Sequence, residues 1–167
     1  MTRSFRNDIL PLKDKLFRLA LRITLNNAEA EDVVQETMIK VWKRRDSWDA
    51  IDNMEVYCMT VCRNMAIDRT RRMGSHTMTL EADMEPADDS HYANPEQQAV
   101  TQERINIVRQ LINQLPEKQR SCMQLRDIEG HSYKDIASIL GITEEQVKVN
   151  IFRARQTIKS KFFSLSV

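Results

Sequence analysis

The stretch from Ser132 to Arg155 constrains the fold of this chain more than any other part of the sequence. Four residues give a short helix an apolar side: Ile136, Ala137, Ile139 and Leu140. Gly141 stands where a left-handed residue ends a helix, and Thr143 is placed to cap the next helix after a turn of about three residues. This pattern predicts a helix-turn-helix, although an ordinary helical hairpin with a solvated polar face has the same pattern.

The second helix of this pattern separates its residues by chemistry. Val147 and Ile151 are four residues apart and are expected to pack inward. The residues expected to point outward are Gln146, Lys148, Asn150 and Arg153. Their side chains suit phosphates and base edges, and further basic residues follow up to Lys161. These residues favour DNA binding over a plain hairpin.

The N-terminal part has the periodicity of three helices. The first is indicated by Ile9, Leu12, Leu16, Leu19, Ala20 and Ile23, and Asn26 and Asn27 then break the pattern and can cap the second. The second has a buried stripe of Val33 or Val34, Thr37, Met38 and Val41. The third is predicted from about Met54 to Arg72, with Met54, Cys58, Val61, Met65 and Asp68 on one stripe. These patterns predict an all-α protein.

The second helix carries a polar face beside its buried stripe. That face consists of Asp32, Gln35, Glu36, Ile39 and Lys43. Carboxylates and an amide beside an exposed isoleucine suit a protein partner with basic side chains. A solvated helix face is the alternative.

Trp48 and the third helix hold the candidate nucleic-acid residues of this part. Trp48 is either a core plug or loop anchor, which is the commoner use, or part of a surface that captures an unpaired base. Arg63 and Asn64 offer hydrogen-bonding groups to base edges. The arginines Arg69, Arg71 and Arg72 suit either the helix dipole or a phosphate backbone.

An acidic segment divides the chain. Residues 74–100 carry six carboxylates and no Lys or Arg, whereas both flanks are mildly basic. Pro86, Pro95 and little periodic apolar content favour a flexible linker there. We therefore predict two small helical domains, at residues 1–73 and 101–167, joined by an acidic linker at residues 74–100. A solvated loop, or a segment lying in a basic channel of a partner, fits the same composition.

Several classes of function are disfavoured. Three glycines cannot form a glycine-rich phosphate loop, and the three scattered histidines have no attendant nucleophile, so neither an enzyme nor a cofactor is expected. Cys58 and Cys62 lack further ligands for a metal, and reduced buried thiols are the preferred interpretation. The sequence has no apolar run of about 18 residues and no signal-peptide core, which favours a cytoplasmic protein without membrane insertion.

Three segments together resemble a known family. They are AEDVVQETMIKVW from Ala30, CRNMAIDRTRR from Cys62, and the helix-turn-helix near the C-terminus. In this order they resemble the extracytoplasmic-function group of RNA polymerase sigma factors, over nearly the whole chain. The resemblance implies sigma region 2 followed by sigma region 4. It also implies a subunit that binds core RNA polymerase, recognises −10 and −35 promoter elements and aids promoter melting.

The resemblance also assigns roles to residues. Those that match the region gripping the β′ clamp helices are Asp32, Gln35, Glu36 and Ile39. Those that match the −10 reading region are Trp48, Arg63, Asn64, Arg69, Arg71 and Arg72. Those that match the −35 reading helix are Lys148, Val149, Asn150, Phe152 and Arg153, and we add Gln146 of the same helix to the −35 candidates. Val149 and Asn150 differ from the small hydroxylic and basic residues common there, so promoter preference does not carry over.

The partners follow from the same resemblance. Promoter DNA, the β′ clamp helices and the β flap of core polymerase are expected, together with an anti-sigma factor. The competing hypothesis is a stand-alone helix-turn-helix regulator with an N-terminal sensor domain. The face formed by Asp32, Gln35 and Glu36 separates the two, because a sensor domain has no need of it.

Overall fold

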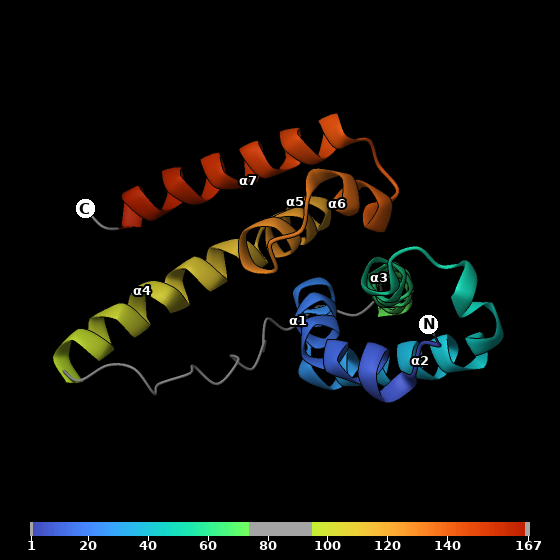
Figure 1. The fold of residues 1–167 in the computed structure, drawn as a ribbon. Coiled ribbons are helices and arrows are strands. Elements are labelled where there is room, and N and C mark those ends of the chain that lie inside the picture. The colour runs from blue at the N-terminus through green and yellow to red at the C-terminus, as the bar shows by residue number, and fades with distance from the viewer. Residues whose placement is uncertain (1, 74–94, 166–167) are drawn as a thin grey trace.

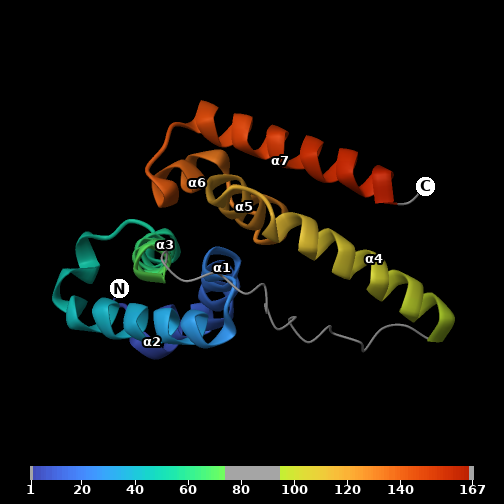
Figure 2. The ribbon, with the colours of Figure 1, turned by 180° about the vertical axis from the view of Figure 1, so that it is seen from behind.

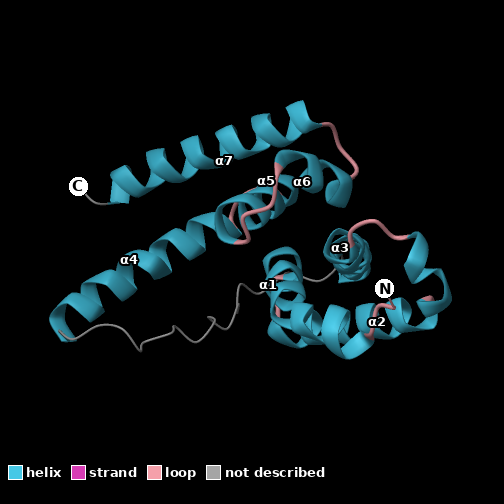
Figure 3. Ribbon diagram, viewed as in Figure 1, coloured by secondary structure: helices cyan, strands magenta, loops and turns pink. Residues whose placement is uncertain are grey.

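The computed structural model describes residues 2–73 and 95–165, and this part of the chain is helical without strands (Figure 3). An N-terminal group contains α1 (Lys13–Thr24), α2 (Asn27–Lys43) and α3 (Met54–Met73). A C-terminal group contains α4 (Pro95–Asn113), α5 (Glu117–Met123), α6 (Tyr133–Leu140) and α7 (Glu144–Leu165) (Figure 1). The predicted all-α class is confirmed. None of the described helices combines the length and apolar composition needed to cross a membrane.

Short irregular helices join these elements. A π-turn (Phe5–Ile9) and a 3₁₀ turn (Leu10–Leu12) precede α1, because Pro11 has no amide hydrogen to continue a regular helix. A 3₁₀ helix (Arg45–Ala50) follows α2, and a π-turn (Gln124–Ile128) follows α5. The apolar residues predicted for the first helix are nevertheless all buried: Ile9, Leu12, Leu16, Leu19, Ala20 and Ile23.

The caps and buried stripes follow the sequence in α2 but not in α3. The Asn26 side chain accepts the amide hydrogen of Glu29, as expected of an N-cap. The buried stripe of α3 is Met54, Cys58, Met59, Cys62 and Ala66. The predicted stripe was therefore wrong at Asp68, which is exposed, and at Val61, which is only half-buried, whereas Met65 is half-buried and packs against the core. The cause is that α3 is covered by α1 and α2 and also by α6.

The helix-turn-helix forms as its turn residues predict. Gly141 ends α6 with φ +68°, and its amide donates to the carbonyl of Ala137. The Thr143 hydroxyl accepts the amide hydrogen of Gln146 at 3.1 Å, and the Gln146 side chain accepts that of Thr143 at 2.9 Å. These reciprocal bonds form a capping box at the start of α7. The predicted roles of Gly141, which ends α6, and of Thr143, which caps α7, are confirmed.

The two helix groups pack on each other. One continuous apolar cluster takes residues from both groups, and α3 contacts α6 while α1 contacts α5 (Figure 2). Arg63 pairs with Glu117 across this interface at 3.1 Å, and buried Arg22 donates to Gln124 at 3.0 Å. The groups are thus held by a shared core as well as by the chain. The predicted acidic linker falls mainly on residues 74–94, outside the described residues, and α4 begins at Pro95.

The three cysteines, Cys58, Cys62 and Cys122, are buried and reduced. Burial, the largest cause, raises the pKa of each thiol to about 12. They therefore pack as small hydrophobes, as the sequence predicts.

We expect these thiols to resist alkylation in the folded chain. At pH 8 their thiolate fraction should be about a thousandfold below that of an ordinary cysteine, so iodoacetamide should modify them mainly after unfolding in guanidinium. Ionisation of the thiols in the unfolded chain should also lower folding stability as the pH rises from about 9 towards 12. Mass spectrometry with and without guanidinium measures the first effect. Fast modification of the native chain would contradict this burial.

Candidate nucleic-acid and protein interfaces

The exposed side of α7 is the first candidate interface. Val147, Ile151 and Ala154 are buried and fix which way the helix faces. The predicted −35 residues lie away from that stripe; exposed are Gln146, Lys148, Val149, Phe152 and Arg153, whereas Asn150 is half-buried. The structure thus brings all six onto the solvent side of one helix.

Several of these side chains already have neighbours. Besides the capping bond of Gln146, the Asn150 amide donates to the Gln146 carbonyl at 2.7 Å. The Lys148 ammonium lies 5.5 Å from the centre of the Tyr133 ring, which Arg126 also approaches at 4.4 Å. Exposed local bonds of this kind are weak and exchange readily, so they orient the side chains without locking them.

The second candidate interface is a pocket between α2 and α3. Its volume is about 450 Å³, and it is lined by Lys40, Arg63, Asn64, Met65, Ile67, Asp68 and Arg71. Three predicted −10 residues, Arg63, Asn64 and Arg71, therefore meet at one place. Lys40 was missed because it belongs to α2, and the periodicity of a single helix does not reveal which residues of two helices meet.

Arg63 is shared between this pocket and the contact of the two helix groups. One of its terminal nitrogens donates to Glu117, and the other lies 3.5 Å from the carbonyl oxygen of Leu140. Its side chain is only 13% exposed. In this arrangement Arg63 faces a carboxylate of the C-terminal group.

Arg69 is placed apart from the pocket. Its guanidinium contacts three carboxylates of α2: Glu29 at 2.8 Å, Asp32 at 3.5 Å, and Glu36. The hydrogen bond to Glu29, followed by the bond to Glu36, raises the pKa of Arg69 above its ordinary value. Arg72 instead pairs with Asp68 on its own helix at 3.0 Å.

The predicted polymerase-binding face of α2 is accessible. Asp32, Gln35 and Glu36 are exposed, and Ile39 is 54% exposed. Two of these residues, Asp32 and Glu36, are the ones that contact Arg69. The polar face of α2 is therefore directly joined to α3.

Trp48 does not lie on an open surface. It is only 4% exposed, and its indole nitrogen donates to the Val41 carbonyl at 3.0 Å. Its ring meets Trp42 edge-on with the centroids 6.2 Å apart. The structure thus favours the loop-anchor interpretation, because the ring has no free face for a base. The exposed tryptophan of this region is Trp42, with Arg45 over its ring at 4.5 Å.

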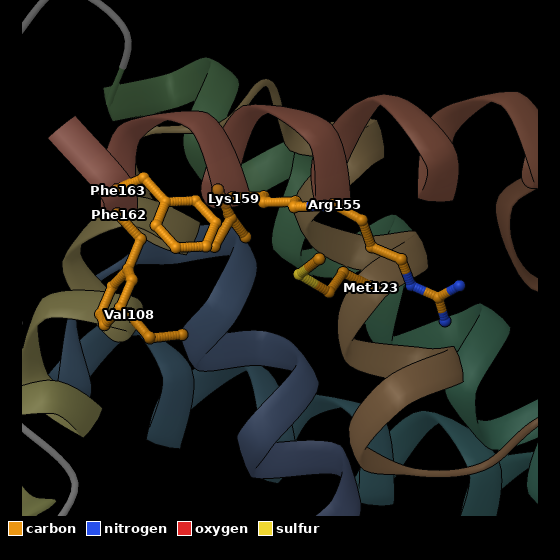
Figure 4. A pocket seen from close by; sticks show the side chains of 7 residues that line it. Val108, Met123, Arg155, Lys159, Phe162 and Phe163 are labelled. Carbon is orange, nitrogen blue, oxygen red and sulfur yellow. The ribbon is translucent and has the colours of Figure 1, made fainter.

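An apolar groove runs between α4 and α7 (Figure 4). Its volume is about 400 Å³, and its apolar lining is Val108, Met123, Ile158, Phe162 and Phe163. Arg155 and Lys159 stand at its edge, with the Arg155 guanidinium turned away from the phenylalanines towards Asp127 (Figure 4). A second pocket of about 460 Å³ shares Val108 and Phe162 and adds Arg104 and Arg109. The groove arises from helices distant in sequence, so local patterns did not predict it.

Comparison with known proteins identifies the family. Residues 9–75 match the family Sigma-70 region 2, and residues 105–158 match Sigma-70, region 4. The ECF RNA polymerase sigma factor SigW of Bacillus subtilis is 30% identical over 164 residues, which cover 92% of this chain and 86% of SigW. The chain is an extracytoplasmic-function sigma factor. The RNA polymerase sigma-H factor of Pseudomonas aeruginosa is also similar, 32% identical with 93% of this chain and 84% of that protein covered.

Solved structures share the fold of this sigma factor. The sigma factor RpoE in complex with the anti-sigma factor NepR from Bartonella quintana matches with a TM-score of 0.73 at 22% identity, covering 98% of both chains. CnrH, in complex with the cytosolic domain of CnrY, matches with a TM-score of 0.67 at 19% identity, covering 96% of this chain and 88% of that one. The sigma factor directs transcription initiation and is not an enzyme, and the hypothesis of a stand-alone regulator is not favoured.

Proposed function

We propose that this sigma factor reads the −35 element with the exposed side of α7 and the −10 element with α3, while the polar face of α2 holds core polymerase. The observation that carries the proposal is the arrangement of α7. Its three buried apolar residues turn Lys148, Asn150 and Arg153 outward together. A helix with lysine, arginine and amide side chains on its free side fits the major groove.

The −10 contact is proposed for the pocket of α2 and α3. Its volume of about 450 Å³ accommodates an unstacked base, and its rim offers the donors and acceptors of Asn64 and Asp68 with the charges of Lys40 and Arg71. Arg63 contributes once it leaves Glu117, and Arg69 and Arg72 extend the basic end of α3. Trp48 supports this region by anchoring the loop after α2.

Protein partners are proposed for two surfaces. The face formed by Asp32, Gln35, Glu36 and Ile39 suits the β′ clamp helices, because it combines carboxylates with an exposed apolar side chain. The groove between α4 and α7 suits an apolar segment such as the β flap (Figure 4).

An anti-sigma factor is proposed as a regulator, since RpoE of similar fold was solved with the anti-sigma factor NepR. Because a protein that acts at promoters must reach chromosomal DNA, we propose that it works in the cytoplasm.

The test is binding to core polymerase. The double variant Gln35→Ala/Glu36→Ala should lower the affinity for core polymerase at least about thirtyfold, equivalent to roughly 2 kcal/mol, because it removes a charged and an amide contact from the interface. Fluorescence titration of labelled sigma factor with core polymerase measures the affinity. Glu31→Ala, another exposed carboxylate of α2, is the matched control and should bind as the unaltered chain does.

Two results would count against this proposal. Equal affinity of the double variant and the control would remove the α2 face from the interface. Stable dimers on DNA, without any binding to polymerase by the unaltered chain, would support a conventional regulator instead.

A further inference from the structure

Arg69 occupies the middle of an acidic stripe on α2. Glu29, Asp32 and Glu36 are three and four residues apart, so their side chains share one face of the helix. The Arg69 guanidinium reaches all three from α3: one terminal nitrogen lies 2.8 Å from Glu29 and 3.5 Å from Asp32, and the other contacts Glu36. A single cation therefore links the two helices.

The electrostatics of the stripe explain this placement. Like charges spaced along one helix face repel each other, and a guanidinium among them relieves the repulsion. The Arg69 side chain is only 20% exposed, whereas Asp32 and Glu36 are 57% and 46% exposed. An incoming cation can therefore reach these two carboxylates from solvent without any movement of α3.

The other arginines at the end of α3 differ in this respect. Arg72 pairs with Asp68 of its own helix and is 74% exposed, which is an ordinary surface pair of little strength. Arg71 lies on the rim of the pocket between α2 and α3. Arg69 is the arginine whose carboxylate partners include two residues assigned to polymerase binding.

We propose that Arg69 is a positioning residue that occupies Asp32 and Glu36 in the free sigma factor and yields them to basic side chains of polymerase. The inference rests on the proposed function of the α2 face. Held then by Glu29 alone, the Arg69 guanidinium can exchange that pair for a phosphate and add its charge to Arg71 and Arg72 at the end of α3 proposed to face DNA. Binding of polymerase is then coupled through one side chain to binding of the −10 strand.

Arg69→Gln tests the first half of the inference. Without its internal competitor, the stripe should bind core polymerase more tightly, by roughly two- to tenfold, since each exposed pair that must be broken is weak. Arg71→Gln removes the same charge from the same helix and should not tighten binding. Arg69→Lys keeps a competing cation and should restore affinity close to that of the unaltered chain. Unchanged or weaker polymerase binding by Arg69→Gln overturns the inference, provided that thermal unfolding shows the variant folded.

Salt dependence tests the second half. With holoenzyme and a single-stranded −10 oligonucleotide, Arg69→Gln should reduce the slope of log affinity against log salt by about 0.7, the value for one phosphate contact. An unchanged slope in holoenzyme overturns the release of Arg69 towards DNA. The variant Gln35→Ala/Glu36→Ala separates the two proposals. If it binds polymerase normally, the α2 face itself is refuted; if it fails to bind while Arg69→Gln shows no gain, only the role of Arg69 is refuted.

Discussion

Replacing Trp48 by alanine should lower the free energy of unfolding by about 3–5 kcal/mol, the usual cost of deleting a fully packed aromatic side chain. Trp48 is buried, its ring packs against Trp42, and its indole nitrogen satisfies the Val41 carbonyl at the end of α2. The truncation removes all three contributions at once. Urea denaturation followed by circular dichroism at 222 nm measures the loss.

A milder variant separates packing from the hydrogen bond. Trp48→Phe keeps most of the apolar volume but leaves the Val41 carbonyl without its indole partner, so it should cost about 1–2 kcal/mol. A Trp48→Ala variant with unchanged stability and a selective loss of −10 binding would contradict the role of an anchor. It would return Trp48 to the group of base-binding residues.

Arg153→Ala should weaken binding to −35 DNA by about 1–3 kcal/mol, roughly five- to 150-fold, if the guanidinium contacts a base edge. Arg153 is exposed on the side of α7 opposite Val147 and Ile151, so its removal leaves the core of the domain intact. Affinity for duplexes that carry single substitutions in the −35 element shows whether specificity relaxes at one position. Lys161→Ala, which removes a charge near the other end of the same helix, is the matched control.

The salt dependence of the same titration distinguishes the kind of contact. An arginine that meets only phosphate should lower affinity evenly across sequences and reduce the salt slope by about one. If Arg153→Ala binds like the unaltered chain at every salt concentration, α7 is not oriented on DNA as proposed.

Local sequence signals predicted the parts of the fold that depend on neighbours along the chain. Asn26, Gly141 and Thr143 act within a few residues, so the helix ends that they set could be identified in advance. The stripes of α1 and α2 followed from periodicity for the same reason. In α3, methionine, cysteine and valine are spread around the helix, and only its packing against α1, where the Cys62 thiol lies 3.4 Å from the Leu16 carbonyl, decides that Cys62 rather than Val61 is buried.

The candidate interfaces, too, could be predicted only where they depend on residues close in sequence. The outward residues of α7 were predictable because the residues that face inward, Val147 and Ile151, are apolar. The partners of Arg63 and Arg69 were not, since each pair joins residues far apart in sequence, 54 positions apart for Arg63 and Glu117. Trp48 was ambiguous because burial of an aromatic side chain depends on the tertiary fold.

The shared core of the two helix groups has a consequence for how promoter affinity is measured. Arg63 cannot face Glu117 and a DNA phosphate at the same time. If Arg63 meets promoter DNA as proposed, molecules with the pair closed do not contribute this contact. Where this contact is required for binding, the apparent dissociation constant equals the intrinsic one divided by the fraction of open molecules. Substitutions at the contact of α3 and α6, remote from any base, would thus change promoter occupancy by changing how many molecules are competent.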